Sequence, residues 1–289
     1  STAPTGNAGV FVGVNLFDKD ESLNSLAYAV NDAVETAYAF VVELKLIPPA
    51  NCTILISGEP NDEGSNRVVA EHLEQLKRAG AKVKAADRSE ILYSFLQSTK
   101  LASSESDVLI VSISSHGFET GGEAYIMPSD GLKELIEGTA VPLNYMESKM
   151  RDSKAGHRIL LVDACQQRVS ARSVEGLGNI TTDAFADAFK EPTGQVKVMS
   201  CSPGQLSFEY RAQGGVGQGL FTHGFLRALR GGADADATGI VRLGSVINYL
   251  EAYVPKKSLE VYERDQLPSL HGPVTWKNLP LAKKSSDIT

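Results

Sequence analysis

A cysteine and a histidine stand out because each follows an apolar, β-branched run of sequence. His116 comes shortly after Asp107–Ile113, Cys165 comes shortly after Arg158–Asp163, and the two residues are 49 positions apart. If these runs form neighbouring parallel strands, both side chains lie at one rim of a sheet. A thiolate there could attack a carbonyl carbon while the imidazole protonates the leaving amine. Gly117 has no Cβ to block a carbonyl oxygen, so we expect the N–H groups of Gly117 and Cys165 to bind the oxyanion.

The segments that must position this pair alternate between strand and helix patterns. Apolar runs predict buried strands at Gly9–Leu16, Thr53–Ile56, Asp107–Ile113, Arg158–Asp163 and Val196–Cys201. Apolar spacings of three and four predict helices at Leu23–Leu46, Ser65–Ala79, Glu90–Leu101, Leu143–Arg151, Thr182–Lys190, Phe221–Arg230 and Leu243–Val254. This alternation predicts an α/β fold with a mostly parallel central sheet and helices on both faces. Two polar segments, Gln166–Thr182 and Tyr210–Gly219, are expected to be long loops beside the strand ends.

Composition narrows the class of protein. Of the 289 residues, 42% are hydrophobic and 22% are charged, and no apolar run approaches the roughly 18 residues of a membrane helix. The 28 basic and 35 acidic residues give a net charge of −7 without a basic stripe, which argues against nucleic acid as a partner. Three cysteines are too few for a disulfide framework, and the first residues do not form a secretory signal. We therefore expect a reducing, cytoplasmic setting.

One domain is the simplest organisation for this length. Residues 1–8 are expected to form an N-terminal extension, residues 9–280 the domain, and residues 281–289 a flexible tail. Within the domain we expect a larger part over 9–165, a loop over 166–182 and a smaller part over 183–280.

Several short motifs occur together in a familiar order. They are Ala29-Val30-Asn31-Asp32-Ala33, Ser114-Ser115-His116-Gly117, Asp163-Ala164-Cys165, Ser200-Cys201-Ser202-Pro203-Gly204-Gln205 with Ser207 and Glu209, and Gly219-Leu220-Phe221-Thr222. With these motifs the chain resembles the caspase-like cysteine peptidases, of the metacaspase or bacterial orthocaspase type, over nearly its whole length. The resemblance implies the caspase-hemoglobinase fold, with Cys165 as nucleophile, His116 as general acid and base, and a thioester acyl-enzyme.

The resemblance also implies a substrate preference. Asp163 occupies the position where caspases that cleave after Asp carry Gln. Asp32 and Ser114 match an acid and a serine that metacaspases place in the same pocket. Two carboxylates and a hydroxyl attract a guanidinium or an ammonium group and repel an aspartate. We therefore expect cleavage of polypeptides after Arg, with Lys second because its ammonium cannot bind as a bidentate fork.

The chain departs from the family just after the cysteine. Gln166-Gln167-Arg168 replaces the small residue or His followed by Ser-Gly of metacaspases and the Arg-Gly of caspases. Asp130 matches one acid of calcium-activated metacaspases, but none of the acids after Cys165 gives a convincing second match, so we expect no calcium dependence, no metal and no other cofactor. Arg168 and Arg172 are candidate processing sites for this or another protease, although an ordinary solvated loop would explain them equally well.

Two alternatives stay open at this point. In the first, the chain is a caspase-like interaction module without turnover, which the unusual Gln166-Gln167 would suit. In the second, the chain is a protease that cleaves after an acidic residue instead of a basic one. Besides a polypeptide substrate, we expect an activating protein or protease as a partner, in a stress, defence or cell-death pathway. No membrane or nucleic-acid partner is expected.

Overall fold

The computed structural model describes residues 6–63, 66–165, 195–202, 205–237 and 239–283. The strands are β1 (Ala8–Val14), β2 (Cys52–Ser57), β3 (Lys82–Ala85), β4 (Val108–Thr120), β5 (Glu123–Ile126), β6 (Val141–Pro142), β7 (His157–Cys165), β8 (Gln195–Met199), β9 (Glu209–Arg211), β10 (Gly217–Gly219), β11 (Ile240–Arg242), β12 (Ser269–His271) and β13 (Pro280–Lys283). The α-helices are α1 (Ala29–Tyr38), α2 (Val68–Ala79), α3 (Arg88–Leu101), α4 (Ile136–Thr139), α5 (Leu143–Asp152), α7 (Leu220–Arg227) and α8 (Leu243–Tyr262). Shorter helical turns are the π-helical Ala39–Glu43 and Ala228–Gly232 and the 3₁₀ turns Pro49–Asn51, Lys133–Leu135 and Val274–Asn278.

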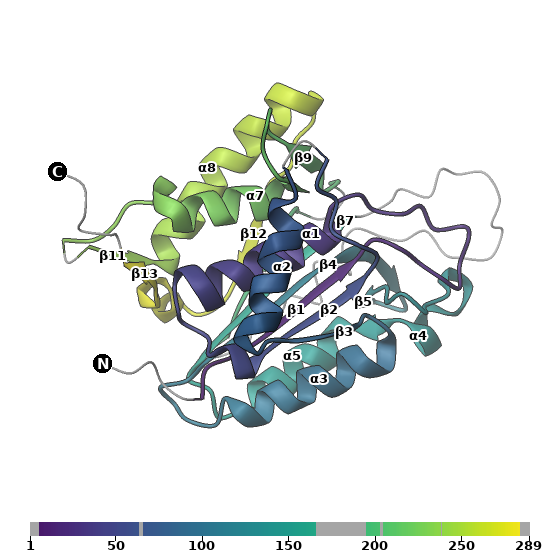
Figure 1. Ribbon diagram of the computed structural model, residues 1–289, viewed down its shortest axis with the longest axis horizontal. Coiled ribbons are helices and arrows are strands. Elements are labelled where there is room, and N and C mark those ends of the chain that lie inside the picture. The colour runs from purple at the N-terminus through teal and green to yellow at the C-terminus, as the bar shows by residue number, and fades with distance from the viewer. Residues whose placement is uncertain (1–5, 64–65, 166–194, 203–204, 238, 284–289) are drawn as a thin grey trace.

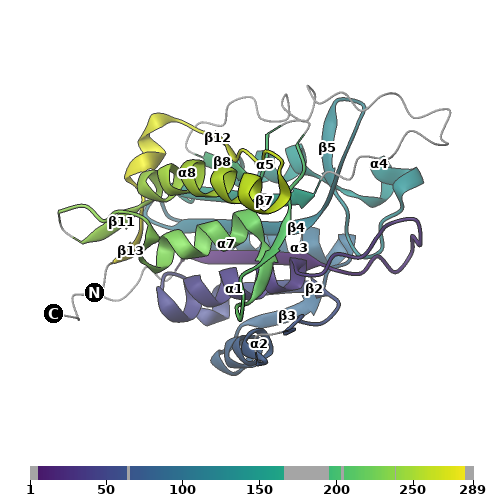
Figure 2. The same cartoon turned by 90° about the horizontal axis from the view of Figure 1, so that it is seen from above.

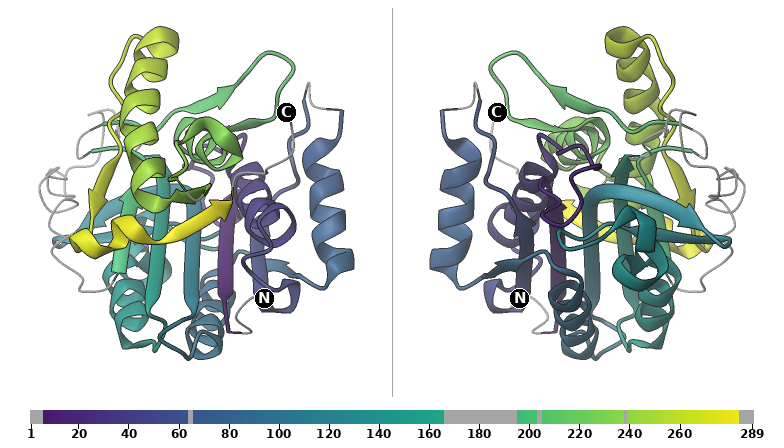
Figure 3. Two further views of the ribbon diagram at one scale, coloured as in Figure 1. Left: turned by 90° about the vertical axis from the view of Figure 1, so that its left-hand side faces the viewer. Right: turned by 90° about the vertical axis from the view of Figure 1, so that its right-hand side faces the viewer.

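A central sheet organises the chain (Figure 1). Its main path has the strand order β12-β8-β7-β4-β1-β2-β3, and β5 and β6 extend it beyond the end of β4. Every neighbouring pair on the main path is parallel except β12 with β8. Helices cover both faces of the sheet (Figure 3), which confirms the predicted α/β class. The helices α1, α7 and α8 lie on one face, as the view from above shows (Figure 2), and α3 and α5 lie on the other.

The two faces of the sheet carry two separate cores, because successive side chains of a strand point to opposite faces. On one face, Phe11 of β1 and Ile159 of β7 pack with the apolar sides of α1, α7 and α8. On the other face, Leu160 of β7 packs with α3 and α5. Lys197 of β8 is fully buried, and its ammonium forms an ion pair with Glu147 of α5, whose side chain is 3% exposed.

Register between β4 and β7 decides where the chemistry can lie. The pairing runs from Val108 opposite His157 to His116 opposite Cys165. β4 then continues to Thr120, well past the predicted end of this strand, because its last residues pair with β5 in an antiparallel hairpin. His116 therefore lies within a long strand instead of following one.

The first helix is shorter than predicted from the pattern of Leu23–Leu46. The α-helix α1 begins only at Ala29, because side chains from distant segments bind the main-chain N–H groups at its start. Asn15 Oδ1 accepts from the Val30 N–H at 3.0 Å. Glu209 Oε1 accepts from Tyr28 at 2.7 Å and from the residue before it at 2.8 Å. Partners so far away in sequence leave no local signal.

The expected loop over Tyr210–Gly219 is wrong in part, because its two ends form the antiparallel pair β9–β10. α8 also runs past its predicted end and through Pro255 to Tyr262. There the Tyr262 ring stacks on Phe208 at 4.4 Å, and its hydroxyl donates to the Glu209 carbonyl. The expected loop 166–182 and the predicted helix Thr182–Lys190 lie outside the described residues.

Two further observations concern the setting of the fold. Within the described ranges, no helix combines the length and apolar character needed to span a bilayer. Cys52 and Cys201 are buried free thiols, and burial raises the pKa of each to about 12.

Candidate active site

The sheet brings together the two residues that the sequence singled out. His116 of β4 and Cys165 of β7 are register partners, and they are the last pair in the parallel pairing of these two strands. Because Ile110 precedes His116 by an even number of residues in β4, the side chain of His116 projects to the face covered by α1, α7 and α8. The main chain of β7 brings Cys165 beside His116.

Contacts of the imidazole fix its protonation pattern. His116 is fully buried, and its Nε2 lies 2.7 Å from the main-chain oxygen of Asn24. A carbonyl oxygen can only accept, so Nε2 carries the proton and a neutral ring has its lone pair on Nδ1. The ring of Phe17 stacks on the imidazole with centroids 4.7 Å apart and planes 20° apart. The ring therefore has one orientation and one basic atom.

The N–H of Gly117 points toward β7. Gly117 lies opposite Ile126 of β5, and the residue after Ile126 donates its N–H to the His116 carbonyl at 2.9 Å. This pattern makes Gly117 and Ile126 a non-hydrogen-bonded pair, in which each N–H points away from the partner strand. The chain after β5 reaches Ser129, whose carbonyl accepts from Asp18 beyond the end of β1. β5 thus lies on the β1 side of β4, and the Gly117 N–H faces the side where β7 ends at Cys165.

An acidic site lies next to this pair. Asp163 of β7 is the register partner of Ser114 of β4, two positions before Cys165 and His116 respectively. The Ser114 hydroxyl donates to Asp32 Oδ2 at 2.8 Å, and the Gly219 N–H donates to Asp32 Oδ1 at 2.8 Å. A Cβ on Gly219 would lie 2.2 Å from Asp163 Oδ2 and 3.1 Å from Asp32 Oδ2. The main chain of β10 therefore touches both carboxyl groups, and only glycine fits there.

Residues from the second part of the chain hold Asp163. The Ser207 hydroxyl donates to Asp163 Oδ1 at 2.6 Å, and the Thr222 hydroxyl donates to Oδ2 at 3.2 Å. Gln266, which is fully buried, donates from Nε2 to Ser207 at 3.2 Å and to a main-chain carbonyl of the neighbouring Ser200 at 2.9 Å. Each oxygen of Asp163 thus has a hydroxyl donor.

Burial makes the charged form of both acids costly. Asp32 is 2% exposed and Asp163 is 5% exposed. The pKa of Asp32 lies well above its ordinary value, first because burial removes its solvation and next because the charge of Asp163 repels it. The pKa of Asp163 is also raised by burial, against the donors that surround it. Two desolvated carboxyl groups of raised pKa form a site that gains free energy from a buried cation.

Several parts of this site have no counterpart in the sequence reasoning. Asn24 contributes a main-chain oxygen, which no side-chain pattern can reveal, and Phe17 has no motif around it. Ser207 and Thr222 lie in matched motifs, so their positions were visible but their contact with Asp163 was not. The candidate processing sites Arg168 and Arg172 lie outside the described residues.

No cluster of three or more His, Cys, Asp or Glu residues capable of holding a metal ion occurs in the described part of the chain. The carboxylate of Asp130 accepts from the Arg88 N–H at 2.8 Å, at the start of α3.

Comparisons with known proteins agree with this architecture. A family model described as "Caspase domain" matches residues 10–277. No curated protein shows a significant sequence match to the chain. The crystal structure of caspase-1 from Spodoptera frugiperda is 14% identical, with a TM-score of 0.56, and the match covers 100% of this chain and 94% of that one. The structure of the Drosophila initiator caspase Dronc is 10% identical, with a TM-score of 0.52 and coverage of 97% and 84%. At these identities the two structures establish likeness of fold.

Proposed function

Because the chain belongs to the caspase-domain family and is a cysteine-type endopeptidase, we propose that it cleaves polypeptides after Arg, and after Lys less well, with Cys165 and His116 as its catalytic dyad. The observation that carries this proposal is the register of β4 and β7, which pairs His116 with Cys165 and Ser114 with Asp163. The proposed dyad therefore lies two residues beyond the acidic pair Ser114 and Asp163 along the same two strands.

The dyad would act through the basic nitrogen of His116. His116 Nδ1 first takes the proton of the Cys165 thiol. The thiolate then attacks the carbonyl carbon before the scissile bond, and the electron pair of the C=O moves onto oxygen. The N–H groups of Gly117 and Cys165 stabilise that oxyanion. When it collapses, the C–N bond breaks, and the leaving amine takes a proton from protonated His116 Nδ1. A water molecule then attacks the thioester and gives one proton to Nδ1. The C–S bond breaks, which releases the thiolate and a carboxylic acid that ionises in solution.

The acidic site would select the residue before the scissile bond. An arginine guanidinium entering beside Asp32 and Asp163 favours their charged forms, which burial disfavours and whose pKa values are therefore raised. The fork of the guanidinium suits two carboxyl groups better than a single ammonium does. An aspartate in the same position would add a third buried carboxylate beside two that already repel one another, so its binding would be unfavourable.

Regulation follows from the same preference. We propose that cleavage after Arg168 or Arg172, or binding of an activating protein, converts a zymogen to the active form. A cytoplasmic location suits the buried free thiols Cys52 and Cys201. A stress, defence or cell-death pathway fits these features, as does a metacaspase-type relationship.

The test uses fluorogenic peptides that differ only in the residue before the cleaved bond. We expect hydrolysis in the order Arg, then Lys, with no hydrolysis after Asp. Cys165→Ala should abolish the signal, while Cys52→Ala, which removes a buried sulfur elsewhere, should retain it in the folded fraction. Equal rates for the wild type and Cys165→Ala would leave the chain an interaction module. Preferential cleavage after Asp would overturn the role of the acidic site and leave the dyad intact.

A further inference from the structure

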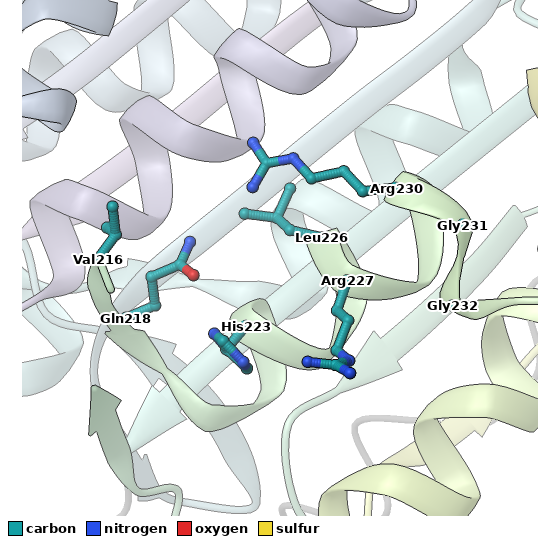
Figure 4. A pocket seen from close by; sticks show the side chains of 8 residues that line it. All are labelled: Val216, Gln218, His223, Leu226, Arg227, Arg230, Gly231 and Gly232. Carbon is teal, nitrogen blue, oxygen red and sulfur yellow. The ribbon is translucent and has the colours of Figure 1, made fainter. Parts of the chain in front are cut away.

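A hollow of about 500 Å³ lies outside the machinery described above (Figure 4). Its lining includes Val216 and Gln218 from the β9–β10 hairpin, His223, Leu226 and Arg227 from α7, and Arg230 from the π-helical turn that follows. Successive side chains of a strand point in opposite directions. Gly219 faces Asp163 and Gly217 faces the ring of Tyr28, so Gln218 projects from the other side of β10. The hollow thus lies behind the strand that closes the acidic site, and its size suits a small organic molecule.

Gln218 carries a buried donor that a ligand would satisfy. Its side chain is 4% exposed, and its Nε2 is buried without a hydrogen-bond partner among the residues described. In Figure 4 the carboxamide of Gln218 and the guanidinium of Arg230 extend toward one another past Leu226. A buried N–H donor that has lost its water and gained no acceptor is unfavourable, so an acceptor between these two groups would stabilise the fold.

The second donor is the guanidinium of Arg230. Its Nε and Nη2 bind Glu43 at 3.1 and 3.0 Å, and Nη2 also lies 3.3 Å from Glu35. The Nη1 of Arg230 makes no hydrogen bond within the described ranges, so it is available to a ligand. Glu35 and Glu43 face the single charge of Arg230 with two carboxylates from outside the lining, and Arg227, whose guanidinium lies 5.7 Å from the ring of Tyr253, is the second cation of the lining.

Among the described residues, the lining contains no acidic side chain. Burial, followed by the positive charges of Arg227, Arg230 and Lys257, lowers the pKa of His223 to about 4. His223 is therefore neutral at physiological pH, and the charged side chains of the lining, Arg227 and Arg230, are both cations. A lining of cations and N–H donors takes an anion rather than a cation. Because two carboxylates already face Arg230, a monovalent anion fits better than a phosphate dianion.

We propose that this hollow binds a small organic monocarboxylate. The carboxylate accepts hydrogen bonds from Gln218 Nε2 and Arg230 Nη1, and the organic part packs against Val216 and Leu226. The site is independent of the proposed peptidase chemistry. Its occupant would nevertheless restrain β10, whose Gly217 carbonyl accepts from Asn31 and whose Gly219 N–H donates to Asp32.

Binding is measured directly, by titrating the full chain with benzoate in isothermal calorimetry and by following the side-chain amide of Gln218 in ¹⁵N-resolved NMR spectra. Chloride at matched ionic strength corrects for general salt effects, and inorganic phosphate is titrated separately. Gln218→Met removes the N–H donor and keeps the length of the side chain. Gln97→Met makes the same chemical change in α3, on the opposite face of the sheet, and is the matched control.

We expect saturable binding of benzoate, a shift of the Gln218 amide resonances on titration, and an affinity at least tenfold weaker in Gln218→Met than in Gln97→Met. Arg227→Met should also weaken binding, since it removes one of the two cations of the lining. Absence of saturable binding overturns the proposal. So does equal affinity in Gln218→Met and Gln97→Met, or binding of phosphate in preference to benzoate. A comparison of thermal unfolding without ligand shows whether Gln218→Met is folded, and Gln218→Glu provides a second variant that places a negative charge against the anion.

Discussion

Replacing Asp32 by asparagine should separate the stability of the acidic site from its function. The oxygen of the new carboxamide could still accept from the Gly219 N–H, while the Ser114 hydroxyl turns to accept from its amide. The shape of the site is thus retained and one titratable group is lost. We expect Asp32→Asn to unfold at a higher temperature than the wild type at neutral pH and to cleave arginyl peptides poorly.

The stability gain follows from the pKa of Asp32, which lies well above its ordinary value of 3.8 because of burial and the charge of Asp163. Between the ordinary and the raised pKa, the folded chain binds more protons than the unfolded chain, so the free energy of unfolding falls as pH rises through this window. Each unit by which the pKa is raised costs about 1.4 kcal/mol at pH values above the window. For a domain of this size that corresponds to roughly 2–3 °C in Tm per unit.

The loss of function should be large. Removing one partner of a buried, hydrogen-bonded charge pair costs on the order of 2–5 kcal/mol. A value of about 3 kcal/mol corresponds to a fall of roughly a hundredfold in kcat/KM for an arginyl peptide. Thermal unfolding between pH 4 and pH 8, together with kcat/KM at neutral pH, measures both effects.

Asp152→Asn is the matched control, because its carboxylate is 64% exposed at the end of α5. This control should leave Tm and kcat/KM nearly unchanged. The stability gain of Asp32→Asn should shrink toward pH 4, where the wild type and the variant both carry a neutral side chain at position 32. A Tm that drops in Asp32→Asn by the same amount at every pH would refute the reasoning, since it would mean that the carboxylate stabilises the free protein. Undiminished arginyl cleavage would refute the placement of the cation.

Three further outcomes are expected. Lowering the pH below neutrality should raise KM for an arginyl peptide, because the raised pKa values of Asp32 and Asp163 mean that protons compete with the guanidinium; a KM profile that is flat from pH 5 to pH 8 would contradict this. Gly219→Ala should lower kcat/KM more than tenfold, because its Cβ would lie 2.2 Å from Asp163 Oδ2, whereas Gly138→Ala, with open space around it, should have little effect; equal activities would mean that β10 yields without consequence. Lys197→Met should lower the free energy of unfolding by about 3–5 kcal/mol in urea denaturation, because it leaves Glu147 buried without its cation. A second change, Glu147→Leu, should restore most of the loss. If the double variant shows no recovery, packing around Lys197, and not the unpaired charge, causes the loss.

Sequence reasoning predicted the parts of the fold that depend on local pattern. The continuous apolar runs behind β1, β4 and β7 identified the central strands, because a strand buried on both faces has few polar residues. Because such strands end at one rim, the sequence alone predicts that His116 and Cys165 lie close together. The ordering of motifs then indicated Asp32, which no helical pattern marks.

Failures occurred where distant contacts override local preference. The hairpin β9–β10 has several glycines in its loop and second strand and no apolar alternation, yet it forms because Asn31 and Asp32 bind its main chain. α8 continues through Pro255 because Tyr262, near its end, packs on Phe208. The start of α1 depends on Glu209, which lies far away in the sequence. Each of these is a tertiary decision that propensity alone cannot anticipate.

The peptide oxygen of Asn24 that accepts from His116 has a consequence for how this protein can change over generations. Every amino acid supplies the same oxygen at that place, so the side chain there is free to drift without disturbing the imidazole. Insertion or deletion between β1 and α1 is another matter, because it would shift the oxygen itself. Selection on this segment should therefore act on its length and main-chain path, while its amino-acid sequence remains variable.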